Sequence, residues 1–132
     1  WDKRNFEVFF QKGEIYISMW SLTREDNFLK EGILNYEKAI SLNPYLIKSY
    51  RRLAYIYETI GNYKEAEKYY VEVLKRYPNK KLYNLEMARY YKKIGENEKF
   101  KFYFEKSKHL QSVTKEEKIM VEEIEKWIEL QK

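Results

Sequence analysis

Residues 47–80 read IKSYRRLAYIYETIGNYKEAEKYYVEVLKRYPNK, and this stretch decides the fold. Its first half repeats large and small apolar side chains at the i, i+3, i+4, i+7 spacing of one helix face: Tyr50, Leu53, Ala54 and Tyr57. Its second half shows the same spacing after Gly61, and glycine suits the left-handed residue that ends a helix. The stretch therefore predicts two helices joined by a short turn.

This pattern returns every 34 residues along the chain. The two prolines, Pro44 and Pro78, are 34 residues apart, and so are Gly61 and Gly95. Aligning the segments 13–46, 47–80 and 81–114 brings residues of one kind to one position, such as Tyr36, Tyr70 and Phe104. A fixed period of this length predicts an array of similar helix–turn–helix units.

The periodicity places helices at 14–25, 28–42, 46–60, 63–76, 80–94, 97–111 and 115–130. Asn62 and Thr114 are each followed three residues later by Glu, which predicts two N-caps. Asn97 indicates a further helix start. Asn27 occupies the aligned position of Gly61 and Gly95, so we expect it to adopt the left-handed turn conformation in the first unit.

The two ends of the chain differ from the repeated units. Residues 115–132 predict a capping helix that is apolar on one side and rich in Glu on the other. Residues 1–12 leave two alternatives open, because their aromatic side chains either extend the first helix or end the second helix of a truncated upstream repeat. The chain begins with Trp1 and not with Met, which favours a processed product or a piece of a longer protein.

The amino-acid composition limits the kinds of domain, site and partner that the chain can have. The chain has 132 residues, of which 44% are hydrophobic and none is Cys, so we expect one domain without disulfides or thiolate metal sites. No apolar run approaches the 20 or so residues that a membrane span needs. The net charge of +5 favours acidic partners, nucleic acid or an anionic surface, or it only keeps the helices solvated. The sequence does not fix the cellular compartment. The cytoplasm is slightly favoured, and a parent protein that is exported or anchored to a membrane is also compatible with it.

The middle unit resembles a tetratricopeptide repeat. That family favours a large residue, Leu, a small residue and Tyr along the first helix, followed by Ala, an aromatic residue, Ala and Pro along the second. The matching residues here are Tyr50, Leu53, Ala54, Tyr57, Ala66, Tyr70, Val73 and Pro78. The resemblance implies an all-α, right-handed solenoid of antiparallel helix pairs, with repeats at 13–46, 47–80 and 81–114 and a capping helix at 115–132. In the first and third units, we also expect one bulky residue to face one small one, as Trp20 would face Gly32.

The resemblance also implies a binding surface. In this family the concave face is lined by the first helix of each unit and usually binds peptide. Projected onto this chain, the groove takes Lys48, Arg51, Arg52, Tyr55, Leu82, Leu85, Arg89 and Lys92 as its partner-binding residues. The same projection puts Glu14 and Glu58 on that face. The positions that clamp the acidic C-termini of chaperones do not match, because Ile17, Ser21 and Leu82 stand where that subtype needs Lys or Asn.

The sequence shows no sign of catalysis. It has no glycine-rich phosphate loop and no nucleophile motif, and its one histidine, His109, stands near a helix end without a catalytic partner. We therefore expect no catalytic residues, no cofactor and no metal.

The interpretation that follows is a non-catalytic module that binds a peptide or protein segment, with an acidic one favoured. Two alternatives stay open. One is a basic helical-repeat binder of nucleic acid, which is disfavoured because the paired base-reading positions are lacking. The other is a structural or self-associating segment of a larger protein.

Overall fold

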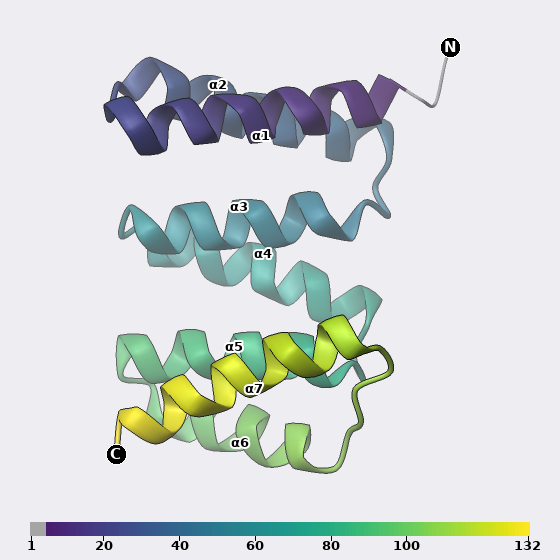
Figure 1. Ribbon diagram of the computed structural model, residues 1–132, viewed down its shortest axis with the longest axis vertical. Helices are drawn as coiled ribbons and strands as arrows, with labels where there is room; N and C mark the ends of the chain where they lie inside the picture. The colour runs from purple at the N-terminus through teal and green to yellow at the C-terminus, as the bar shows by residue number, and fades with distance from the viewer. Residues whose placement is uncertain (1–4) are drawn as a thin grey trace. The chain divides into compact units, whose positions relative to one another are not determined.

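The computed structural model describes residues 5–132 of the chain, and these residues are helical without any strand. In chain order the helices are α1 (Asn5–Thr23), α2 (Asp26–Leu42), α3 (Ile47–Thr59), α4 (Tyr63–Arg76), α5 (Lys81–Ile94), α6 (Asn97–Lys108) and α7 (Lys115–Leu130). Figure 1 shows that consecutive helices reverse direction across short links. The all-α solenoid class that the sequence predicts is confirmed.

The turns between paired helices match the expectation at two positions and differ from it at a third. Gly61 and Gly95 have φ angles of +83° and +84°, so both adopt the left-handed conformation expected of them. Asn27 does not, because α2 has already begun at Asp26. Arg24 has the positive φ instead, at 59°. The first turn thus comes three residues earlier than the alignment predicts.

Most of the predicted N-terminal segment belongs to the first helix. Residues 5–12 form the beginning of α1, which runs without a break to Thr23. Residues 1–4 of the predicted N-terminal segment lie outside the described residues.

The chain forms two compact units, Trp1–Glu72 and Val73–Lys132. The boundary lies inside α4 and not between two repeats. Each unit is described by itself below.

The core of the first unit is built from α1 to α4. One cluster of buried residues in this core consists of Phe10, Tyr36, Ala39, Leu46, Leu53 and Ile56. Aromatic rings join the second helix pair, since Tyr57 and Tyr69 stack with their centroids 5.8 Å apart. Most of the aromatic residues in this unit therefore serve helix packing.

Two glycines allow α1 and α2 to approach closely. A Cβ atom on Gly13 would lie 2.7 Å from the ring of Tyr36, and one on Gly32 would lie 2.5 Å from Cδ1 of Ile17. The sequence predicts the need for a small residue at Gly32 but names the wrong neighbour, since Ile17 and not Trp20 faces it. The side chain at position 20 is only partly buried.

One contact repeats with the 34-residue period. The hydroxyl of Tyr50 donates to the carbonyl of Pro44 at 2.9 Å, and Nδ2 of Asn84 donates to the carbonyl of Pro78 at 3.0 Å. Both donors lie six residues after the proline. The carbonyl groups of the two prolines thus accept hydrogen bonds at the same position of the repeat, but from different side chains.

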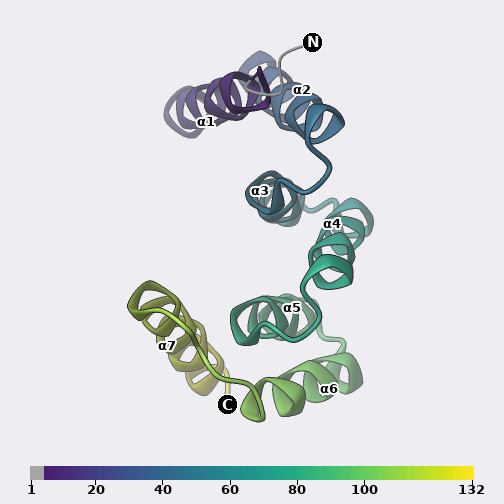
Figure 2. The same cartoon turned by 90° about the vertical axis from the view of Figure 1, so that its right-hand side faces the viewer.

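The second unit centres on α5, which packs against both α6 and α7. Figure 2 shows α7 returning beside α5. The predicted N-cap at Thr114 is confirmed, because its side chain accepts a hydrogen bond from the N–H of Glu117. The carboxylate of Glu117 also pairs with Lys80 at 2.5 Å, which ties the start of α7 to the residue before α5. The buried residues of α7 are Val121 and Ile128, whereas Met120 is exposed.

Candidate functional site

One face of α3 carries four of the predicted binding residues. Lys48, Arg51, Arg52 and Tyr55 follow the i, i+3, i+4, i+7 spacing of a single helix face. Lys48 and Arg51 are partly exposed, Arg52 is exposed, and the side chain of Tyr55 is 60% exposed. The opposite side of α3 supplies core residues such as Leu53. We refer to Lys48, Arg51, Arg52 and Tyr55 as the α3 face.

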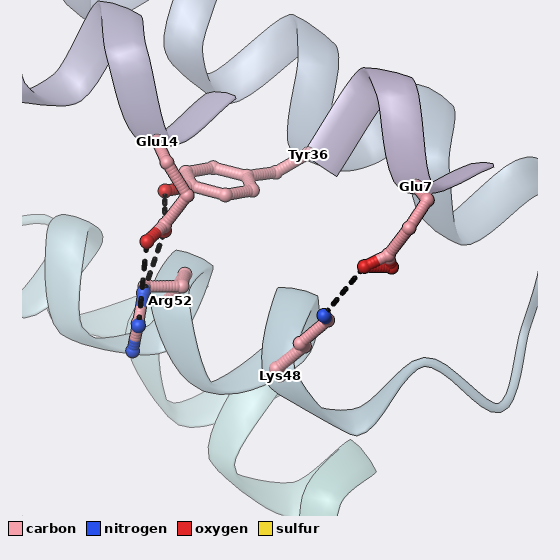
Figure 3. Close-up of polar contacts among 5 residues, drawn as sticks. All are labelled: Glu7, Glu14, Tyr36, Lys48 and Arg52. Atoms are coloured by element: carbon pink, nitrogen blue, oxygen red, sulfur yellow. Dashed lines mark hydrogen bonds and ion pairs between the residues drawn. The ribbon is translucent and has the colours of Figure 1, made fainter. Parts of the chain in front are cut away.

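The carboxylate of Glu14 contacts two side chains, one of which belongs to this face. It accepts hydrogen bonds from Nε of Arg52 at 2.7 Å and from Nη2 at 3.5 Å. It also accepts a short hydrogen bond from the hydroxyl of Tyr36, a residue that is completely buried (Figure 3). Glu14 therefore connects α1 to both α2 and α3.

The titration of these groups reflects the same contacts. Burial raises the pKa of Glu14, but hydrogen bonds from Arg52 and Tyr36 outweigh that effect, so the pKa lies below its usual value. The pKa of Arg52 is raised, chiefly by its hydrogen bond to Glu14. Burial, followed by the hydrogen bond to Glu14, raises the pKa of the Tyr36 hydroxyl far above its usual value. Glu14 is thus held as a carboxylate and Tyr36 as a neutral phenol.

A second ion pair lies nearby and has a simpler geometry. Nζ of Lys48 lies 2.7 Å from Oε1 of Glu7, and both side chains are more than two-fifths exposed. The same ammonium lies 4.2 Å from the ring centroid of Phe10, a cation–π distance. Figure 3 shows Glu7 and Glu14 on α1 reaching the two cations of α3. The basic α3 face is therefore neutralised in part by the neighbouring helix.

Glu58 does not belong to the exposed surface, contrary to its projection from the sequence. It is 1% exposed, and its carboxylate accepts a hydrogen bond of 2.7 Å from the hydroxyl of Tyr70. The paired helix α4 supplies that donor, so Glu58 faces its partner helix and not solvent.

The predicted residues of α5 separate into two groups. Leu82 and Leu85 are 3% and 0% exposed, so the expectation that they form apolar contacts on the surface is wrong. The physical reason is that α5 has two helix neighbours in its unit, α6 and α7, and buries side chains on more than one face. Arg89 and Lys92 remain partly exposed. Nζ of Lys92 lies 5.1 Å from the ring centroid of Phe100 on α6.

Tyr55 is not the most exposed aromatic residue among residues 5–132. Tyr45 and Phe102 are 79% and 63% exposed, respectively. Phe102 lines a shallow hollow of about 510 Å³ on α6 together with charged side chains that include Lys101 and Glu105. His109 also borders this hollow.

Across residues 5–132, no group of three or more His, Cys, Asp or Glu side chains has the arrangement of a metal site. Within the same range, no helix combines the length and apolar character that crossing a bilayer requires.

Comparison with known proteins adds one finding. A family model described as tetratricopeptide repeat matches residues 47–80, the stretch that holds α3 and α4. Residues 47–80 therefore form a repeat of the tetratricopeptide type within an all-helical chain. Repeats of this family generally serve as non-catalytic modules for protein–protein interaction. No curated protein matches the chain.

Sequence reasoning missed how α1 contributes to the α3 face. Glu7 is not among the predicted site residues, and Tyr36 is named only as a residue that recurs at one position of the repeats. The one available signal was the seven-residue spacing of Glu7 and Glu14, which puts two acids on one side of an early-starting α1. Their partners on α3 lie 41 and 38 residues away, beyond any local pattern.

Proposed function

We propose that the protein is a non-catalytic interaction module that binds an acidic peptide or protein segment through the first helices of its repeats. The observation that carries the proposal is the α3 face, where the partly exposed cations Lys48 and Arg51 lie on the same side of the helix as the exposed ring of Tyr55. The opposite face of the same helix is buried, so this arrangement stands on a rigid element.

The chemistry of this face suits a ligand with carboxylate groups. Arginine presents a planar fork of N–H donors that matches a carboxylate, and lysine adds a mobile point charge. A tyrosine ring beside them supplies apolar contact area at a low entropy cost. The second unit has partly exposed cations of its own on α5, Arg89 and Lys92, which we treat as a separate surface. Leu82 and Leu85 have no part in this proposal because they are buried.

A peptide selection tests the proposal. Random peptides of about twelve residues are displayed on phage and selected on the immobilised protein, and the winners are measured by fluorescence anisotropy. We expect the selected peptides to be rich in Asp and Glu. Arg51→Glu combined with Arg89→Glu should weaken their binding by about tenfold or more, since charge-assisted contacts become repulsive. Far-UV circular dichroism should show unchanged helicity.

A matched variant controls for net charge. Lys30→Glu combined with Lys101→Glu makes the same change in charge at exposed positions on α2 and α6. It should alter peptide affinity far less than the Arg pair does. Equal effects of the two double variants, or a selection that enriches no peptide, would overturn the proposal.

Nucleic acid is the competing outcome of the same assay. A fluorescent random-sequence RNA is titrated at several salt concentrations alongside the peptides. If the RNA bound tightly, with a log–log salt slope that indicates several phosphate contacts, the basic surface would be assigned to nucleic acid.

A further inference from the structure

The α3 face is already occupied by carboxylates of the protein itself. Oε1 of Glu7 lies 2.7 Å from Nζ of Lys48, and Oε1 of Glu14 lies 2.7 Å from Nε of Arg52. A ligand that brings carboxylates to this face must therefore compete with α1 for the same cations. The two ion pairs differ in how readily a ligand can displace their carboxylates.

The Glu14 contact is fixed from both sides. Its carboxylate takes donors from Arg52 and also from the hydroxyl of Tyr36, a completely buried residue. Removing Glu14 from this position would leave the buried hydroxyl without its acceptor, which is costly inside a protein. A ligand thus gains little by displacing Glu14.

The Glu7 contact is open. Within the described residues, the contact recorded for Glu7 is its hydrogen bond to Lys48. The side chain of Lys48 is 41% exposed and that of Glu7 is 43% exposed. Exposed ion pairs of this kind contribute little to stability. Releasing Glu7 does not release Lys48, because the ring of Phe10 lies 4.2 Å from the ammonium and still favours its present place.

The geometry points to Glu7 as an internal stand-in for the ligand: a carboxylate of the bound peptide replaces Glu7 on Lys48, while the Glu14–Arg52 pair stays closed. This inference rests on the proposed function of the α3 face. Lys48 is then the cation that exchanges one carboxylate partner for another, whereas Arg52 keeps Glu14 as its partner. The partner it fits is a segment whose carboxylate reaches the Lys48 end of α3.

The test uses fluorescein-labelled hexaglutamate as the probe and labelled hexaglutamine as its uncharged counterpart, both measured by anisotropy at low salt. Glu7→Gln should tighten hexaglutamate binding by about two- to fivefold, the scale of an exposed ion pair. Glu31→Gln removes one negative charge from an exposed site on α2 and should leave the affinity close to that of the unaltered protein. Lys48→Gln should weaken binding, and Glu7→Gln should have no further effect in the Lys48→Gln background.

A second readout follows Arg52 directly. Its Nε–H signal in a ¹⁵N NMR spectrum reports the hydrogen bond to Glu14 and should keep its position when hexaglutamate saturates the protein. A shift of this signal upon binding would mean that the Glu14 pair opens, and that result would overturn the assignment of Lys48 as the exchanging cation.

The outcomes separate this inference from the proposed function. If the unaltered protein binds hexaglutamate but Glu7→Gln behaves like Glu31→Gln, the exchange at Lys48 is wrong and the α3 face stands. If neither the unaltered protein nor Glu7→Gln prefers hexaglutamate over hexaglutamine, both the exchange and the acidic ligand are overturned.

Discussion

The carboxylate of Glu14 satisfies a hydroxyl that the fold has buried. Tyr36 is completely enclosed, and a buried phenol without an acceptor would cost about 1–3 kcal/mol. Glu14 is the acceptor, and Arg52 balances its negative charge from the exposed side. One side chain therefore supports the core of the first unit and also shapes the α3 face.

This arrangement predicts how stability depends on pH. The pKa of Glu14 is lower in the folded chain than its ordinary value of 4.5. Its ionised form therefore stabilises the fold above that value, and the stabilisation is lost as the pH falls through the folded pKa. We expect Glu14→Gln to lower the free energy of unfolding by about 1–2 kcal/mol at pH 7 and by much less at pH 3. Urea unfolding at both pH values measures the difference.

A second acid on the same unit serves as the control. Glu31→Gln removes an exposed carboxylate, so its effect should stay within about 0.5 kcal/mol at either pH. If Glu14→Gln cost the same at pH 3 as at pH 7, the ionised carboxylate would not be the stabilising species.

The residue contacts differ in how far a sequence can predict them. Asn62 and Thr114 cap helices through donors only three residues away, and a local rule finds both. The contact between Glu14 and Tyr36 spans 22 residues and joins two helices. Nothing in the spacing of the sequence selects this pair from the many acids and tyrosines of the chain.

At the scale of elements, the first helix pair depends on close approach. Gly13 on α1 lies against the ring of Tyr36 on α2, and Gly32 on α2 lies against Ile17 on α1. Each helix thus presents a glycine to a large side chain of the other, which lets the pair pack without a gap.

Gly13→Ala tests this packing against helix propensity. Alanine should favour an isolated helix by about 1 kcal/mol over glycine. Its Cβ would, however, lie 2.7 Å from a ring that is fully enclosed, and such overpacking costs about 1–3 kcal/mol. We expect a net loss in the free energy of unfolding of about 1 kcal/mol, measured by thermal or urea denaturation.

Ser18→Ala is the matched change on the same helix, because position 18 is exposed. It should leave the stability unchanged or raise it by a few tenths of a kcal/mol. A Gly13→Ala protein that gained as much stability as Ser18→Ala would show that α1 and α2 can separate slightly at no cost.

The element boundaries were largely predictable, whereas the burial of α5 was not. Apolar periodicity and the glycines give the ends of α3, α4 and α5 to within one residue of their observed positions. Leu82 and Leu85 were expected on an open face because the pattern of one repeat says nothing about a helix that returns beside it. The packing of α7 on α5 is a property of the chain end, which the repeat does not encode.

At the scale of the whole molecule, the repeat and the compact unit are different divisions. The sequence repeats every 34 residues, yet the two compact units meet inside α4, between Glu72 and Val73. In repeat proteins stability is approximately a sum of local terms and nearest-neighbour contacts. A local defect should therefore weaken the unit that contains it more than the other.

Hydrogen exchange measured by mass spectrometry can test this division. Thr114→Ala removes the N-cap of α7 and should cost about 1 kcal/mol, which speeds the exchange of amides that open with that helix by roughly fivefold. We expect the faster exchange in peptides from α5 to α7 and little change in peptides from α1 to α3.

The reciprocal variant completes the argument. Gly13→Ala introduces its defect between α1 and α2, so it should speed exchange in the first unit and leave α6 and α7 nearly unchanged. If either variant accelerated exchange equally in both units, the chain would open as one cooperative body, and the boundary inside α4 would have no thermodynamic meaning. Opposite patterns in the two variants would instead show that each unit opens with its own free energy, as nearest-neighbour coupling requires.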